Sequence, residues 1–233
     1  MSEIVSLGLF TSRSLASQEE GHRLLRLLES AGEGLAIRRY GPSEPLEHRF
    51  DPADPDAALQ SWGTNWFFWE ARRKGVLGSY SEGVSRGRRD AIHLIIEEDG
   101  FDPGSLLEFM GNAADALRAD FAYLHKTFPE ELADREYYRV HVMPFTQGLS
   151  ALALQKGLPG IPWTMYIGAG FPGGCAPTLS QVPAFSTQVV GDGLVIQSTE
   201  HLYDYKRDYQ PYRTASDKIG SFLKAQIPQI IGS

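Results

Sequence analysis

Ile92-His93-Leu94-Ile95-Ile96 is the stretch that decides the fold. Its apolar residues are nearly continuous, which is typical of a central strand with both faces covered. Further strands are predicted on either side along the chain. They cover Ile4 to Phe10, Trp66 to Trp69, Tyr137 to Val142 and Trp163 to Ile167, and a hairpin from Val189 to Ser198 turns at Asp192-Gly193.

The longest helix is predicted from Pro103 to about Thr127, with Asp102 as its cap. Its apolar residues recur at helical spacing, so Glu108, Asp115 and Asp120 should face solvent or a partner. Shorter helices are expected after a cap at Ser14 or Ser17, over residues 145–157, and from Arg213 to Ile227.

These elements predict an α+β fold. A largely antiparallel sheet, or two such sheets, would pack against the long 103–127 helix and the C-terminal helix. The 233 residues suffice for one domain, or for two α/β lobes split near residue 136.

The acidic charge is concentrated in one segment. The net charge is −7, and residues 97–136 contain eleven acidic side chains against three basic ones. A surface of one sign repels nucleic acid and attracts basic partners. The simpler interpretation is a solvated helix face that keeps the protein soluble.

The composition points to a cytoplasmic protein with no membrane partner. Cys175 is the single cysteine, so no intrachain disulfide can form. The N-terminal residues lack the pattern of a secretory signal, and no apolar run approaches the length of a membrane helix.

The sequence motifs predict no catalytic residue, cofactor site or metal site. Gly168 to Gly173 matches G-x-G-x-x-G, but prolines interrupt the following stretch and leave no helix for a pyrophosphate, so a structural loop is expected. His93 and Glu97 are four apart on a strand, too far apart to share a metal. No basic group near Cys175 would activate its thiol.

The aromatic residues form two clusters, Trp62 to Trp69 and Trp163 with Tyr166. Most should be core. Strand alternation predicts Trp163 on the same side as Met165 and Ile167, with Thr164 and Tyr166 on the other. Tyr166 is therefore a candidate contact residue, since tyrosine is enriched at binding hot spots.

The block Gly157-Leu158-Pro159-Gly160-Ile161-Pro162-Trp163-Thr164-Met165-Tyr166-Ile167-Gly168 resembles the bacterial immunity protein 52 family. The run from Gly193 to Glu200, the stretch around Asp204 and a final helix resemble it too. The resemblance implies a cytoplasmic antidote to a toxin, often one delivered by type VI secretion with a restriction-endonuclease-like nuclease domain. It implies no catalytic residue.

A nuclease binds phosphates through basic surface, and carboxylates of an antidote can occupy that surface. The predicted partner-binding residues are Glu97, Glu98, Asp99, Glu108, Asp115, Asp120 and Tyr166. The partner would be the toxin, with no direct contact to nucleic acid.

Other interpretations remain open at this stage. The toxin could instead bind the basic stretch at Arg86, Arg88 and Arg89, or the 168–183 loop. A small-molecule enzyme could assemble a site from His141, Cys175 and Asp204. An adaptor of a secretion apparatus is a third possibility, and the sequence leaves the oligomeric state open.

Overall fold

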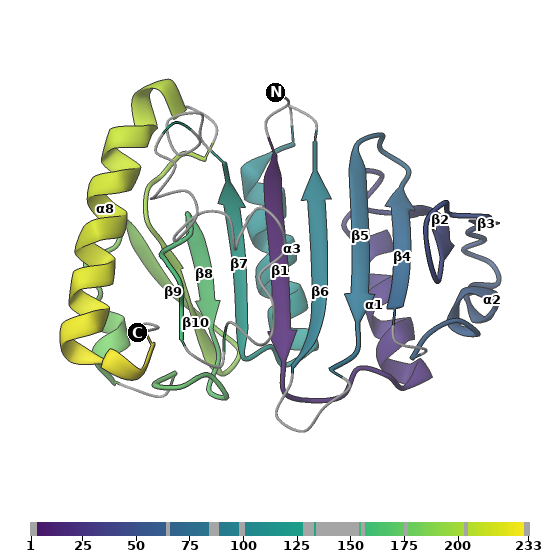
Figure 1. Cartoon of the computed structure of the whole chain (residues 1–233), viewed down its shortest axis with the longest axis horizontal. Coiled ribbons are helices and arrows are strands. Elements are labelled where there is room, and N and C mark those ends of the chain that lie inside the picture. The colour runs from purple at the N-terminus through teal and green to yellow at the C-terminus, as the bar shows by residue number, and fades with distance from the viewer. Residues whose placement is uncertain are drawn as a thin grey trace.

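The computed structural model describes residues 4–63, 66–83, 89–97, 101–127, 133, 154, 157–174, 177–202 and 205–230. These residues form one antiparallel ten-stranded sheet in the order β3-β2-β4-β5-β6-β1-β7-β8-β10-β9 (Figure 1). The strands are β1 (Val5–Thr11), β2 (Ile37–Gly41), β3 (His48–Arg49), β4 (Trp66–Ala71), β5 (Val76–Ser81), β6 (Asp90–Ile96), β7 (Phe121–Lys126), β8 (Thr164–Ile167), β9 (Ser186–Val190) and β10 (Gly193–Gln197).

The predicted α+β class with an antiparallel sheet is confirmed. The apolar run at residues 92–96 lies in β6, between β5 and β1, so its predicted central position is also confirmed. Strands from both sides of residue 136 share the sheet, because β7 pairs with β8.

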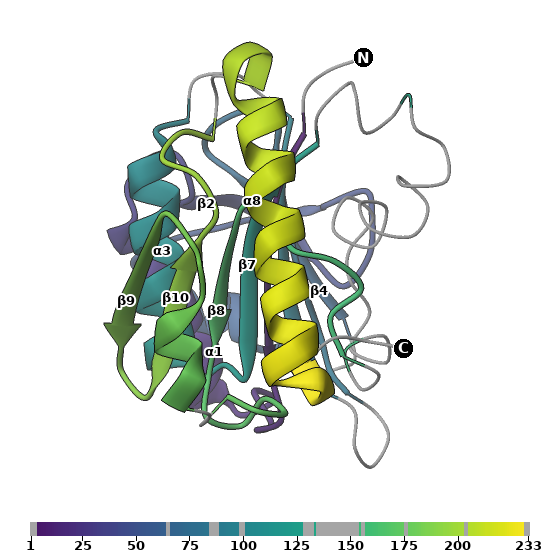
Figure 2. The same cartoon turned by 90° about the vertical axis from the view of Figure 1, so that its left-hand side faces the viewer.

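The two faces of the sheet carry different helices. Alternating side chains of β1 divide between the two faces. Leu7 and Leu9 pack in the cluster that contains α1 (Gln18–Ser30) and α3 (Pro103–Ala116). Phe10 packs in the cluster that contains Ile219 and Leu223, in the second half of α8 (Tyr205–Gln226). We call these the first and second faces. Figure 1 shows α1 and α3 behind the sheet, and Figure 2 looks along the sheet toward α8 and β9.

The capping predictions hold for two helices. Ser17 caps α1 and accepts a hydrogen bond from the Glu20 amide, and Asp102 caps α3 in the same way through Ser105. The short helix α2 (Pro55–Leu59) packs against α1. Two 3₁₀ helices, η2 (Pro177–Gln181) and η3 (Pro228–Ile230), complete the described elements.

The predicted helix from 103 to 127 is wrong in its second half. The helix ends at Ala116, Arg118 takes a positive φ of 49°, and the next residues form β7. Every side chain of β7 is buried, because β1 and β8 flank it and both faces of the sheet are covered. A short apolar run of this kind fits a helix stripe and a buried strand equally well.

The longest helix described is α8, with 22 residues; it begins before the predicted Arg213 and contains Pro211. The predicted strand 137–142 lies outside the described residues, as does most of 145–157. None of the described helices is both long and apolar enough to cross a membrane.

Candidate functional site

An acidic corner forms where four elements meet. The end of α3, the start of β7, strand β8 and the β9–β10 turn bring together Asp115, Asp120, Tyr166 and Asp192, although these residues are far apart in sequence. Three of the four are among the predicted partner-binding residues. Asp192 was predicted only as a turn residue.

Asp120 is not exposed, so its predicted place on a solvent-facing helix surface is wrong. The residue is 4% exposed and stands just before β7. Its carboxylate pairs with the Arg89 guanidinium at 2.8 Å and accepts hydrogen bonds from the Ser12 amide and hydroxyl. Arg89 and Ser12 therefore compensate the charge of Asp120 within the molecule, as a buried carboxylate requires a paired cation and hydrogen-bond donors.

Tyr166 is also buried, so it cannot offer its ring to a partner in this conformation. Its hydroxyl donates to Asp192 Oδ1 at 3.1 Å. Burial first, and then the carboxylates of Asp192, Asp115 and Asp120, raise the pKa of the Tyr166 hydroxyl. The ring lies over Gly193, where an added Cβ would meet it at 2.4 Å.

The predicted side of β8 is correct for Tyr166. Met165 and Ile167 pack in the second-face cluster, and Tyr166 packs in the first-face cluster. Trp163 precedes β8 and is buried in a cluster that also contains Tyr209 and Tyr212 of α8.

Asp115 and Glu108 are exposed on α3, as predicted. Among the described residues, no basic side chain forms an ion pair with either of them or with Asp192. Asp115 lies against the β9–β10 turn, where a Cβ on Gly191 would meet its Oδ1 at 1.9 Å. The corner thus presents two exposed carboxylates, Asp115 and Asp192, beside one turn, and neither forms an ion pair among the described residues.

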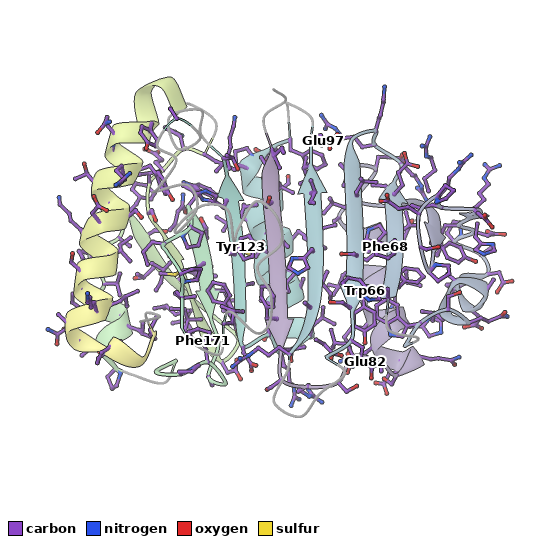
Figure 3. All side chains as sticks on the ribbon, viewed as in Figure 1. Trp66, Phe68, Glu82, Glu97, Tyr123 and Phe171 are labelled. Atoms are coloured by element: carbon purple, nitrogen blue, oxygen red, sulfur yellow. The ribbon has the colours of Figure 1, made fainter. Side chains whose placement is uncertain are left out.

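Glu97 lies far from this corner. It follows β6 at the end opposite Asp90, and Figure 3 shows it at the upper end of the sheet, with Phe171 near the lower end. Phe171 packs on Phe121 at the corner. Glu98 and Asp99 lie outside the described residues, as do Arg86, Arg88, Cys175, His141 and Asp204.

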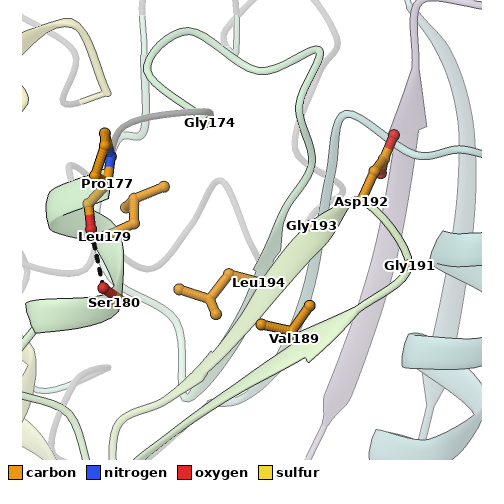
Figure 4. A pocket seen from close by; sticks show the side chains of 9 residues that line it. All are labelled: Gly174, Pro177, Leu179, Ser180, Val189, Gly191, Asp192, Gly193 and Leu194. Carbon is orange, nitrogen blue, oxygen red and sulfur yellow. Dashed lines mark hydrogen bonds between the residues drawn. The ribbon is translucent and has the colours of Figure 1, made fainter.

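A shallow groove of about 430 Å³ adjoins the corner on the second face (Figure 4). The side chains of Pro177, Leu179, Val189 and Leu194 give it an apolar lining, and Asp192 lies at one end. Ser180, also in the lining, donates its hydroxyl to the Pro177 carbonyl. This mainly apolar lining suits an apolar side chain.

The turn beside the groove differs from the prediction by one residue. Gly191 and Asp192 are the turn residues, and Gly193 begins β10. Gly191 has φ +57° at the first turn position, which is the pattern of a type II′ hairpin.

The 168–173 loop is built by close packing, as the sequence indicated. A Cβ on Gly168 would meet the Ala119 carbonyl at 2.2 Å, and one on Gly170 would meet Asp120 at 2.1 Å. The described chain continues into the 3₁₀ helix η2 and not into an α-helix that could meet a pyrophosphate. Within the described ranges, no three His, Cys, Asp or Glu side chains are grouped as metal ligands.

A second exposed surface lies on β4. Trp62, Phe67 and Trp69 are buried, as expected of the aromatic cluster, but Trp66 is 50% exposed and stacks on Phe68 at 5.6 Å. Both project from the second face (Figure 3). The sequence could have indicated this exposure, because alternate residues of a strand point to opposite faces. Trp66 and Phe68 therefore point to one face, and Phe67 and Trp69 to the other.

No protein-family model matches the chain, and no curated protein matches it. Among solved structures, the chain is similar to the Pseudomonas aeruginosa T6SS (type VI secretion system) protein PA0821. The TM-score is 0.62 at 13% sequence identity, and the match covers 99% of this chain and 76% of that one. The likeness establishes a shared fold.

Proposed function

We propose that the protein is an immunity protein that binds and neutralises a cognate bacterial toxin, a type VI-secreted nuclease of restriction-endonuclease-like fold. It acts by binding and carries out no reaction of its own. The observation that carries the proposal is the fold shared with a T6SS protein over nearly the whole chain. The resemblance of residues 157–168 to an immunity-protein family is a second ground for the proposal, although no protein-family model matches the chain.

The binding surface proposed is the exposed part of the acidic segment. Glu108 and Asp115 on α3, together with Asp192, are exposed carboxylates without ion pairs among the described residues. A nuclease carries basic surface for phosphates, and unpaired carboxylates are complementary to it. Asp120 and Tyr166 support this surface from inside by fixing the start of β7 and the β9–β10 turn.

The test begins with the reading frame next to this gene, which the proposal expects to encode the toxin. Co-expression with this protein should restore growth that the toxin abolishes, and the two proteins should co-purify. Glu108→Lys with Asp115→Lys should slow association by about tenfold at low salt and flatten its salt dependence, because electrostatic steering acts on the association rate.

Glu44→Lys with Glu47→Lys is the matched control. Both side chains are exposed between β2 and β3, at the other edge of the sheet, so the same charge change should leave association unchanged. Unaltered association in the Glu108/Asp115 variant would remove this surface from the interface. Turnover of a substrate by the purified protein, abolished by one substitution, would contradict the proposal itself. Stable binding to apparatus proteins without toxin would favour an adaptor.

A further inference from the structure

Strand β9 is an edge strand without the usual protection. Its residues Ser-Thr-Gln-Val-Val contain no charge and no proline, and among the described residues it pairs only with β10. Four of the five are exposed, and Val189 reaches 74%. Edge strands normally carry charges, prolines or bulges that prevent pairing with another chain. Figure 2 looks on to this edge.

The outer backbone groups of β9 can be assigned from the hairpin. A two-residue turn makes Val190 and Gly193 the first hydrogen-bonded pair, and the pairing then alternates along the strand. Thr187 and Val189 therefore turn their N–H and C=O groups away from β10. A strand added outside β9 would bond to these groups.

The two sides of this edge differ in chemistry. On the second face, Val189 borders the apolar groove with Leu179 and Leu194. On the first face, Val190 lies near Gly111 of α3, and the free carboxylate of Asp115 lies by the turn. An added strand would project alternate side chains to the two sides.

We propose that β9 accepts an extended segment of the toxin as an eleventh strand, with apolar and basic residues alternating along it. An apolar side chain enters the groove beside Val189, and a basic side chain near the turn meets Asp115 and Asp192. Backbone pairing gives affinity and the groove gives selectivity, as in other cases of strand addition. This inference rests on the proposed function and names the part of the toxin that is bound.

Charge complementarity favours a toxin segment over a second copy of this chain. Two β9 strands paired antiparallel would place residues 183–186 of one copy beside the acidic turn of the other. Residues 183–190 contain no basic side chain, so the carboxylates would stay unpaired.

The first experiment uses a short synthetic peptide in which valine and lysine alternate. On titration into ¹⁵N-labelled protein, amide signals of residues 186–194 should shift, while those of β1 and α1 stay in place. A peptide alternating valine and glutamate should produce no shift. Absence of shifts with the lysine peptide, or equal shifts with both peptides, overturns the inference.

Variants at one position separate backbone pairing from side-chain effects. Val189→Pro removes an outward N–H that β10 does not use, and should weaken peptide binding by about tenfold or more. Val189→Thr keeps the N–H and should bind nearly normally. If Val189→Pro disturbs the hairpin signals, Val189→Lys replaces it, since a cation at the edge repels the basic segment.

The last experiment measures amide hydrogen exchange in the complex of this protein with the toxin from the growth test. Protection of residues 186–190 that Val189→Lys abolishes supports the inference. Protection around Trp66 and Phe68 alone overturns it and leaves the proposed function intact. Peptide binding without toxin binding contradicts the proposed function and removes the toxin as the occupant. A dimer that Val189→Lys dissociates identifies a second copy as the occupant and also overturns the inference.

Discussion

The two edges of the sheet are built in opposite ways. Edge strand β3 has two residues, and its Arg49 stands directly opposite Arg39 of β2, so like charges discourage a further strand. Edge strand β9 is longer and uncharged, and it lies between an apolar groove and an acidic corner. One edge carries devices that discourage pairing, and the other lacks them among the described residues. Composition alone does not reveal this difference.

The largest difference should appear between the buried ion pair at the acidic corner and an exposed ion pair near β3. Asp120→Ala leaves the Arg89 guanidinium buried without its partner, which should cost about 3–5 kcal/mol of unfolding free energy. Arg38→Ala breaks the exposed pair with Glu70 near β3 and should have a much smaller effect, because water screens an exposed pair. Urea denaturation measures both. Similar losses would show that the acidic corner is not fixed by its buried pair.

The stability of the protein should fall at acidic pH because of His93, in the middle of the sheet. Burial lowers the pKa of the His93 imidazole on β6 to about 4, from an ordinary value near 6.5. The unfolded chain therefore takes up this proton first, and stability should fall by roughly 2–3 kcal/mol as pH drops from 6.5 to 4. His93→Gln should lose that part of the pH dependence in thermal melts. An unchanged profile would contradict the lowered pKa of His93.

The tight packing at the β9–β10 turn should make the protein less stable when even one methyl group is added there. Gly193→Ala places a Cβ within 2.4 Å of the Tyr166 ring and should destabilise the protein by about 1–3 kcal/mol. Gly220→Ala in α8 meets its nearest atom at 3.5 Å and should stabilise by about 0.5–1 kcal/mol, because alanine favours the helix. Melting temperatures should therefore move in opposite directions. A neutral Gly193→Ala would show that Tyr166 can move aside.

The smallest effect is expected at β3. Arg49→Thr removes the like charge opposite Arg39 and should raise stability by about 0.2–1 kcal/mol. It should also make this edge more prone to self-association, which sedimentation would detect at high protein concentration. Lower stability in the variant would mean that Arg49 contributes a favourable contact of its own.

Local rules predicted most elements, and they failed where burial on two sides decided the structure. Residues with a clear cap and period, such as those after Ser17 and Asp102, form the expected helices. Residues 121–126 carry apolar side chains that also suit a helix, and only their place between β1 and β8 makes them a strand. The sequence of one strand does not show whether that strand lies at the edge or in the centre of a sheet, because its position depends on which other strands pair with it.

The candidate site was predictable only in part. The acidic excess pointed correctly to Glu108 and Asp115 as exposed carboxylates. The acidic excess could not distinguish these two residues from Asp120, whose carboxylate is buried and paired with Arg89, a residue 31 positions away. The acidic excess also could not predict that Asp115 and Asp192 lie at the same corner, because their proximity depends on the packing of α3 near β9.

The sequence by itself determined the α+β class, the central strand at 92–96, the helix caps and the acidic character of one segment, because these depend on local periodicity and composition. Tertiary structure alone decided which carboxylates are free, where the groove lies and which edge of the sheet is open. Those features depend on contacts between distant residues, and burial or pairing of a charge is a property of its neighbours in space.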